Sequence, residues 1–252
     1  MLSVNGGAKG LSQYYKNEQI GGMLFVSNFH LLIYVFVFMG SAFELGCAST
    51  PSQVQLEANA IMNSGWWHLS PSQSLHICSS IDGIHCNDAG SVTRIIYRYQ
   101  EGPIQLATLN LSAFKNLEHL EVVESSLYGT IPSEIGNLSN LYFLDLSHNS
   151  LQGEISSSLG YLTNLWTLII SNNKINGTLP ISLSNIKLLQ NIDISHNLLT
   201  GSLKLFSVEY FPFLERLDLS YNGISGVVPM LLCGILYLNL SFNNLNGPIP
   251  NC

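Results

Sequence analysis

The feature that most constrains this chain is an apolar pattern that returns about every 24 residues. Written as Leu-x-x-Leu-x-Leu-x-x-Asn-x-Leu-x-Gly, with Ile replacing Leu in places, it recurs with start-to-start steps of 24, 24, 24, 25 and 21 residues. The copies begin at Leu117, Leu141, Leu165, Leu189, Leu214 and Ile235, and a weaker first copy contains Val92, Ile95 and Tyr97. No single unit of this kind can bury its apolar side alone, so the pattern predicts a core built by stacking.

Each copy predicts one short strand, in which the periodic residues point inward and the residues between them point outward. The predicted fold class is an α/β repeat: a right-handed leucine-rich-repeat solenoid with a curved parallel sheet on its concave face and 3₁₀ helices or loops on its convex side. About seven repeats are expected over residues 92–252, the last one incomplete and uncapped. The strands are expected at about 95–97, 118–122, 142–146, 166–170, 190–194, 215–219 and 236–240.

An asparagine follows the strand in most copies, and its short amide is suited to bonding the backbone of a turn. Because successive turns stack, we expect these amides to lie above one another as a ladder. The ladder residues are Asn149, Asn173, Asn197, Asn222 and Asn243. Ser125 occupies the equivalent position of the second copy, which predicts a weaker bond there.

The composition excludes several classes of function. Hydrophobic residues make up 46% of the chain and charged residues 10%, with a formal net charge of −7, which argues against disorder and against nucleic-acid binding. His148 and His196 share one repeat position two turns apart, about 9–10 Å by strand spacing, which is too far for one metal ion. The serines and aspartates near the strands recur at fixed positions of the repeat, so the repeat explains them without a catalytic role. The sequence therefore predicts no enzyme, no metal site and no cofactor.

Residues 1–48 differ in composition from the repeat. Residues 1–22 are polar and glycine-rich, which predicts a disordered leader. Residues 23–48 contain the apolar run Leu31–Met39 followed by small residues, a pattern typical of a secretory signal peptide. An uncleaved signal anchor is the alternative, and the true start is either Met1 or Met23. Both alternatives predict entry into the secretory pathway.

The number and spacing of the cysteines are consistent with export of the chain. Cys78 and Cys86 are close in sequence, and in an exported chain such a pair predicts a disulfide. A zinc site would need two more ligands at suitable spacing, and only two histidines lie nearby. Cys233 and Cys252 either pair across adjacent turns or leave Cys252 free.

The sequences of the repeats resemble a known class of leucine-rich repeat. SHNSLQGEIS, SNNKINGTLP and SFNNLNGPIP are similar to the plant-specific leucine-rich repeat. Residues 49–91, with a helix expected at 53–61 and the stretch GWWHLS, are similar to the N-terminal cap of that class. The chain thus resembles the N-terminal part of the ectodomain of plant leucine-rich-repeat receptor-like kinases and receptor-like proteins. It departs from the family in having one extra residue between the cap cysteines, and Ile81 where a tryptophan is usual.

This resemblance implies that the concave face binds a secreted peptide or another leucine-rich-repeat ectodomain acting as co-receptor, in the apoplast or at the extracellular face of the plasma membrane. Exposed aromatic residues beside charged ones, as expected on this face, are typical of recognition surfaces. The candidate ligand-binding residues are Phe143, Asp145, Trp166, Ile169, Asp193, His196, Arg216, Asp218 and Tyr237. Other positions expected to point outward on this face are Glu118, His119, Glu121, Tyr142, His148, Tyr221 and Phe242.

Four sequons predict N-glycosylation in an exported chain, at Asn110, Asn137, Asn176 and Asn239. Asn239 lies on a predicted concave strand, where a glycan would obstruct binding, so we expect it to be used least.

Two alternatives to a receptor module stay open. A secreted inhibitor of cell-wall hydrolases, resembling polygalacturonase-inhibiting proteins, would have more repeats and a second cysteine cap. The second alternative is a truncated receptor fragment without an independent role. Such a fragment would stop in mid-repeat, as this sequence does at Cys252, and would contain no kinase motif, as is the case here. In either case the uncapped last repeat predicts self-association.

Overall fold

The computed structural model describes residues 23–24, 35–36, 51–70, 73, 76–99, 102–206 and 210–251. The chain divides into two units, residues 1–50 and 51–252. In the first unit the described residues form two short strands, β1 (Met23–Leu24) and β2 (Val35–Phe36), which pair antiparallel. The expected leader and most of the expected signal peptide lie outside the described residues.

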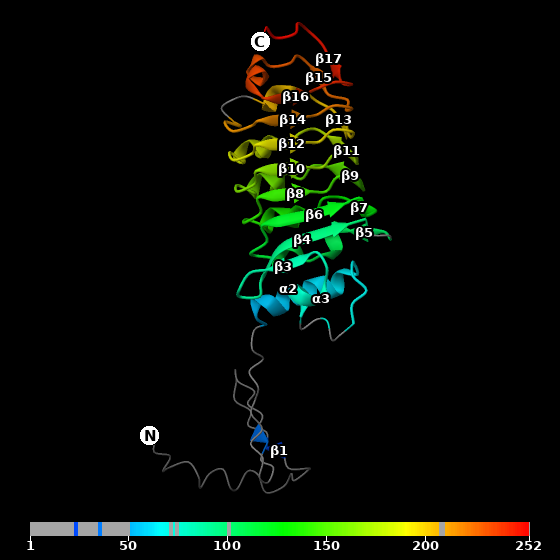
Figure 1. Cartoon of the computed structure of the whole chain (residues 1–252), viewed down its shortest axis with the longest axis vertical. Coiled ribbons are helices and arrows are strands. Elements are labelled where there is room, and N and C mark those ends of the chain that lie inside the picture. The colour runs from blue at the N-terminus through cyan, green and yellow to red at the C-terminus, as the bar shows by residue number, and fades with distance from the viewer. Residues whose placement is uncertain are drawn as a thin grey trace, which may run out of the picture. The chain divides into compact units, whose positions relative to one another are not determined.

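The second unit is a stack of turns built on one long sheet (Figure 1). In the described part of the chain this sheet has eight strands: β3 (Ile84–Cys86), β4 (Val92–Arg98), β6 (His119–Val123), β8 (Phe143–Asp145), β10 (Thr167–Ile169), β12 (Asn191–Asp193), β14 (Arg216–Asp218) and β16 (Tyr237–Asn239). Strands β4 to β16 are parallel, as the 24-residue period predicts. The first strand, β3, pairs antiparallel with β4 and was not expected from the repeat.

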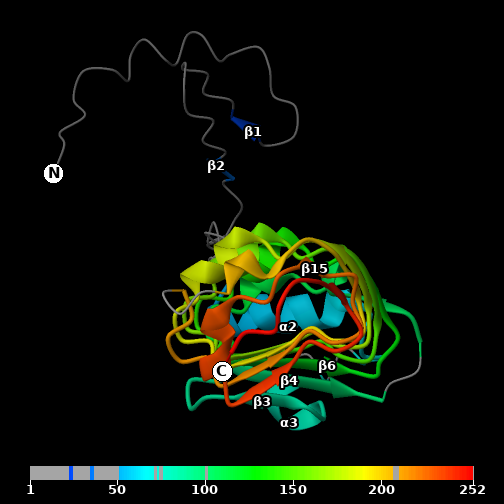
Figure 2. The same ribbon diagram turned by 90° about the horizontal axis from the view of Figure 1, so that it is seen from above.

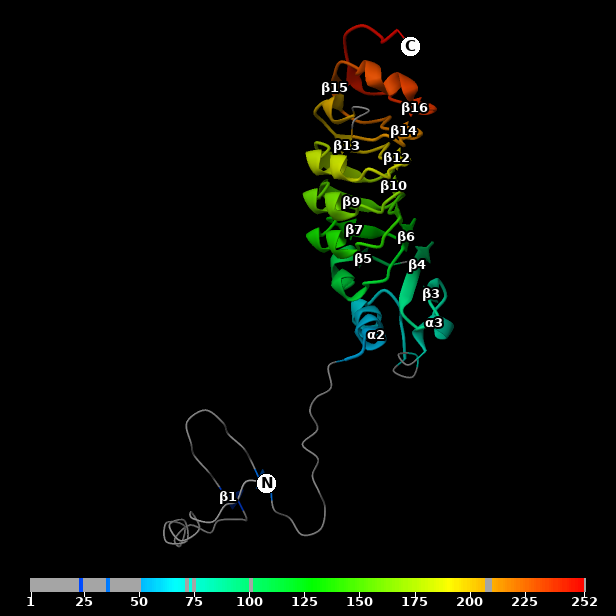
Figure 3. The same cartoon turned by 90° about the vertical axis from the view of Figure 1, so that its left-hand side faces the viewer.

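The other side of each turn carries shorter elements, which lie away from the long sheet (Figures 2 and 3). Short strands form a five-stranded parallel sheet and a further pair: β5 (Ile104–Gln105), β7 (Leu127–Gly129), β9 (Ser150–Glu154), β11 (Lys174–Gly177) and β13 (Leu198–Leu199), then β15 (Ser225–Gly226) and β17 (Asn244–Leu245). The convex side is made of 3₁₀ helices: η2 (Leu106–Thr108), η3 (Leu111–Ala113), η4 (Ser133–Asn137), η5 (Ser157–Tyr161), η6 (Ile181–Asn185), η7 (Leu203–Leu205) and η8 (Met230–Gly234).

The core runs through the middle of the stack. Leu144, Leu168 and Ile192 are direct neighbours on adjacent strands, and all three are buried. The same register repeats along the parallel strands, so each turn covers the apolar side of the turn before it. This arrangement confirms the predicted solenoid fold.

The asparagine ladder is present as predicted. The Asn173 side chain donates from Nδ2 to the carbonyls of Leu146 and Ile170 and accepts at Oδ1 from the Leu151 N–H at 2.9 Å. Each ladder residue therefore bonds the backbone of its own turn and of the previous turn. The same pattern holds for Asn149, Asn197, Asn222 and Asn243. The Ser125 hydroxyl donates to carbonyl oxygens, and the Asn149 amide accepts from the Ser125 N–H.

A small helical region closes the N-terminal end of the stack. Helix α2 (Gln53–Ser64) is capped by the Ser52 hydroxyl and ends at Gly65, which has a φ of 74°. The carboxylate of Glu57 is fully buried and accepts from the Ser91 hydroxyl and from the Val92 N–H at 2.8 Å. This contact ties the helix to the first strand of the parallel stack.

Aromatic residues complete the junction between the cap and the stack. The rings of Trp66 and Trp67 pack against Tyr97, and the Tyr97 hydroxyl donates to the Trp66 carbonyl at 2.7 Å. Helix α3 (Ile77–Ser80) follows, and Cys78 is disulfide-bonded to Cys86 of β3. The extra residue between the two cysteines is therefore compatible with the bond.

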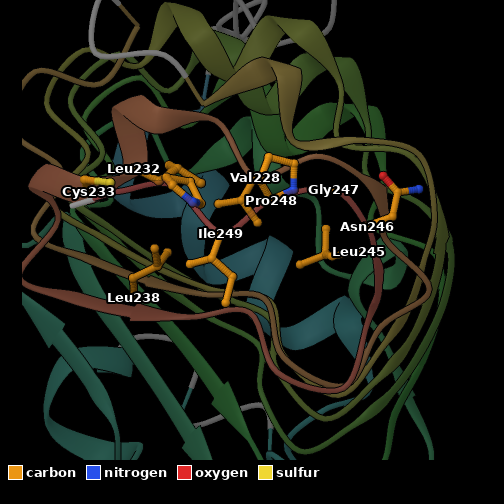
Figure 4. Close-up of a pocket in the computed structure, with 10 residues that line it drawn as sticks. Val228, Leu232, Cys233, Leu238, Leu245, Asn246, Gly247, Pro248 and Ile249 are labelled. Atoms are coloured by element: carbon orange, nitrogen blue, oxygen red, sulfur yellow. The ribbon is translucent and has the colours of Figure 1, made fainter.

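The last described turn is less covered than the turns before it. Leu236 is 85% exposed and Ile249 is 92% exposed, and β16 is an edge strand of the described sheet. Apolar side chains surround a pocket of about 340 Å³ in this turn (Figure 4). Its lining residues include Val228, Leu232, Leu238, Leu245 and Ile249. Cys233 is disulfide-bonded, and Cys252 lies outside the described residues.

Candidate functional site

The concave face is the side of the long sheet opposite the buried leucines, and its side chains are arranged in columns across the strands. Two columns cover most of it. The first, which we call the acidic column, consists of Glu121, Asp145, Ile169, Asp193, Asp218 and Asn239. The second consists of His119, Phe143, Thr167, Asn191, Arg216 and Tyr237. Neighbours in a column are one strand spacing apart, about 4.8 Å.

Most carboxylates of the acidic column are held by the turn that follows them. Oδ1 of Asp193 accepts from the Ser195 N–H at 3.1 Å and from its hydroxyl at 2.7 Å. Asp218 makes the same two bonds with Ser220. Because one oxygen is fixed in this way, the orientation of the whole carboxyl group is restricted.

Two aspartates of this column differ in the direction of their pKa shifts. Burial raises the pKa of Asp145 above its ordinary value, although bonds from Ser147 oppose the shift. Burial also opposes ionisation of Asp218, but hydrogen bonds from Ser220, Asn239 and Tyr237 outweigh it and lower the pKa of Asp218. Asp218 is therefore the carboxylate of the pair that stays ionised at lower pH.

The N-terminal half of this face, strands β4 to β8, contains a closed charged network. Arg98 forms an ion pair with Glu121, and His119 lies 3.2 Å from the other Glu121 oxygen. Burial would raise the pKa of Glu121, but the bonds from Arg98 and His119 outweigh it and lower that pKa. His119 and Glu121 lie on the concave face as predicted, but both are buried there, and Phe143 stacks on the His119 ring at 4.2 Å.

The C-terminal half, strands β10 to β16, is more open. Trp166 precedes β10 and is 50% exposed, and Tyr142 lies beside its ring at 5.8 Å. The Arg216 guanidinium lies 3.8 Å from the ring centre of Tyr237, a cation–π contact. Arg216 forms no ion pair with any described residue.

A third column follows the strands. The rings of His196, Tyr221 and Phe242 stack at 4.1 Å with interplanar angles of 14° and 15°, and all three are exposed. Their backbones have φ values of 53–54°, a left-handed conformation that is uncommon for bulky residues. Each residue was expected on this face, but the stack was not. A signal for it was available, since each residue directly precedes a ladder asparagine.

The nine candidate ligand-binding residues therefore share one sheet face, but not one environment. Phe143 and Asp145 belong to the N-terminal half, and the others lie on or beside β10 to β16. Ile169 is half-buried between Asp145 and Asp193. Their role in binding stays a prediction.

The sequons lie mostly away from this face. Asn110 directly precedes the convex helix η3, Asn137 is the last residue of η4, and Asn176 lies on β11; all three are exposed. Asn239 is half-buried on β16, and its Nδ2 donates to Asp218 at 3.0 Å. In the described residues, no helix has the length and apolar character needed to cross a membrane, and no group of three metal-ligating side chains comes together.

Comparison with known proteins agrees with this geometry. The family model named Leucine Rich Repeat matches residues 140–162, 164–186 and 213–235. A search of curated protein sequences found no match. The family model thus matches three of the turns that the fold stacks.

The solved structures that the chain is similar to include the ectodomain of a plant membrane receptor kinase. The GASSHO1/SCHENGEN3 ectodomain from Arabidopsis thaliana, in complex with CASPARIAN STRIP INTEGRITY FACTOR 2, is 26% identical with a TM-score of 0.60, over 79% of this chain and 28% of that chain. Pollen Receptor Kinase 3 is 27% identical with a TM-score of 0.58, over 69% of this chain and 85% of that chain. The BIR3–SERK2 complex from Arabidopsis thaliana is 26% identical with a TM-score of 0.51, over 79% and 97%.

The particular proteins that the chain resembles are thus the leucine-rich-repeat ectodomains of plant receptor kinases. The chain spans 26%, 36% and 28% of the first three solved chains that it matches.

Proposed function

We propose that this chain is an extracellular recognition module of a plant receptor-like kinase or receptor-like protein. It binds a secreted peptide or a partner ectodomain through the concave face. Two of the solved neighbours are themselves complexes, which supports this proposal: one is with CASPARIAN STRIP INTEGRITY FACTOR 2 and one is between BIR3 and SERK2.

The observation that carries the proposal is the C-terminal half of the concave face. Trp166, just before β10, and Tyr237, on β16, present large aromatic surface beside oriented carboxylates, and the ladder fixes the positions of these strands. Rigid aromatic residues next to charges are the composition of binding hot spots. A solvent-facing sheet has no structural need for a half-exposed tryptophan.

Two further features support an extracellular site. The Cys78–Cys86 disulfide is the kind of bond that persists in oxidising compartments. Three of the four sequons lie off the concave face, so glycans there would leave the face accessible. We infer that the chain enters the secretory pathway and acts in the apoplast or at the outer face of the plasma membrane.

The test is selection of binders from a random peptide library on the secreted full chain. Peptides enriched on the wild-type chain should lose binding to Trp166→Ala, since that ring is half exposed on the proposed site. Tyr161→Ala is the matched control, because Tyr161 is an exposed aromatic residue on the convex helix η5. Equal loss in both variants, or no enrichment at all, would contradict peptide binding by this face.

A further inference from the structure

The C-terminal half of the concave face carries aromatic groups along two sides. Trp166 lies at the start of the strands, and the stack of His196, Tyr221 and Phe242 lies at their ends. Asp193 and Asp218 lie between these two sides, on adjacent strands. A ligand on this surface therefore meets the half-buried carboxylate of Asp193, with the buried charge of Asp218 beside it and rings on both sides.

The two aspartates keep negative charge that this face does not neutralise. Asp193 uses Oδ1 for Ser195, and no described residue donates to its Oδ2. Asp218 is buried, and its Oδ2 receives hydrogen bonds from Tyr237 and Asn239, both uncharged donors, so its charge lies just beneath the surface. The pair therefore carries two charges about one strand spacing, ~4.8 Å, apart.

The nearest basic side chain on these strands, Arg216, does not pair with these aspartates. Arg216 lies two positions before Asp218 on β14, yet it stacks on the Tyr237 ring and pairs with neither carboxylate. The contrast with Arg98, which pairs with Glu121 in the N-terminal half, shows that the repeat can supply an internal cation to this column. In the C-terminal half the negative charge has no internal cation, so a positively charged ligand would complement it.

A guanidinium group fits this combination of side chains. It donates to carboxylates with its planar N–H groups while its face stacks on aromatic rings, whereas an ammonium group satisfies only the charge. An extended peptide advances about 3.3 Å per residue, so three or four residues span the strands from β10 to β14. One basic side chain over the aspartates and one apolar side chain over Trp166 can therefore come from the same short segment.

We propose that the C-terminal half of the concave face binds an extended peptide through an arginine side chain that bonds Asp193 beside the buried charge of Asp218, with an apolar side chain of the peptide against Trp166. The proposal rests on the proposed function and adds the chemistry of the ligand. Lysine is the second choice at the same position, because it provides charge without stacking.

The experiment uses the same random peptide library on the secreted full chain. Peptides enriched on wild type should be rich in arginine, and their affinity should fall about tenfold or more in the double variant Asp193→Asn with Asp218→Asn. Both asparagines keep an oxygen that can accept the serine bonds. Glu134→Gln is the matched control, because Glu134 is an exposed acidic residue on the convex helix η4, and it should leave affinity unchanged.

A second measurement covers the case in which the double variant does not fold. Binding of an enriched peptide to wild type should weaken with added salt, since salt screens exposed charges with a Debye length that falls to about 10 Å at 0.1 M. Peptides that require Trp166 but show no basic preference and no salt dependence would overturn this inference and leave the proposed function standing. If no peptide depends on Trp166, both the proposed function and this inference fail.

Discussion

In the N-terminal half of the concave face Glu121 is 4% exposed and bonded to Arg98 and His119, whereas in the C-terminal half Asp193 is half-buried and bonded only to its own serine. The two residues occupy the same column, at equivalent positions of two different repeats. A position in the solenoid therefore fixes where a side chain lies but not which groups it contacts. One carboxylate is part of the fold, and the other is available to a ligand.

The largest expected effect comes from the ladder, which both halves share. Replacing Asn197 by Ala removes a buried amide and leaves the Ile175 N–H without its acceptor, which should lower the free energy of unfolding by about 2–3 kcal/mol. Asn149→Ala should cost a similar amount. Urea denaturation measures both, with the exposed Asn246→Ala as control. If the two substitutions lowered the free energy of unfolding by very different amounts, the two halves of the concave face would differ in their backbone bonding and not in their charged side chains.

The next effect separates the halves directly. Glu121→Ala should lower the free energy of unfolding by about 2 kcal/mol, because it leaves the buried His119 without its partner. Asp193→Ala should cost about 1 kcal/mol or less, since it removes bonds at a partly exposed turn. If Asp193→Ala proved the more costly change, Asp193 would be a structural residue and the comparison would be wrong.

The N-terminal network should also make stability depend on pH. Burial lowers the pKa of His119, and its bond to Glu121 offsets this only in part. The unfolded chain then binds the His119 proton at a higher pH than the folded chain does, so stability should decrease as the pH falls below about 6.5. His119→Asn should reduce this slope in thermal melts between neutral and mildly acidic pH. An unchanged slope would show that His119 does not titrate as described.

The smallest effect concerns glycans, which we expect on exposed sequons away from the concave face and not on the concave face itself. Asn239 is half-buried and bonded to Asp218, so its sequon should be unoccupied on the secreted chain. Asn176 is exposed and should carry a glycan. Mass spectrometry of the glycopeptides measures both. Full occupancy at Asn239 would place a glycan on the proposed binding surface and would argue against its use.

Much of the fold follows from the sequence, because the repeat period sets the strand register. The parallel strands, the ladder and the Cys78–Cys86 bond were all predicted from spacing or composition and are present. What spacing does not encode is how side chains on neighbouring strands meet. Burial of His119 under Phe143 depends on two residues 24 positions apart, and β3 belongs to the cap, outside the period.

The candidate site shows the same limit. Its residues could be placed on one face because outward positions alternate with buried ones along a strand. The ring stack of His196, Tyr221 and Phe242 was missed, since it depends on the left-handed backbone at each of these positions. Likewise, the different surroundings of Glu121 and Asp193 arise from which neighbours happen to be basic or aromatic.

The most direct test of the central claim is hydrogen–deuterium exchange of the secreted chain with and without an enriched peptide. We expect slower exchange on binding in residues 190–196 and 215–221, with residues 94–98 and 119–123 unchanged. Protection confined to the N-terminal strands, or to the convex helices, would contradict the claim that the C-terminal half of the concave face is the recognition surface.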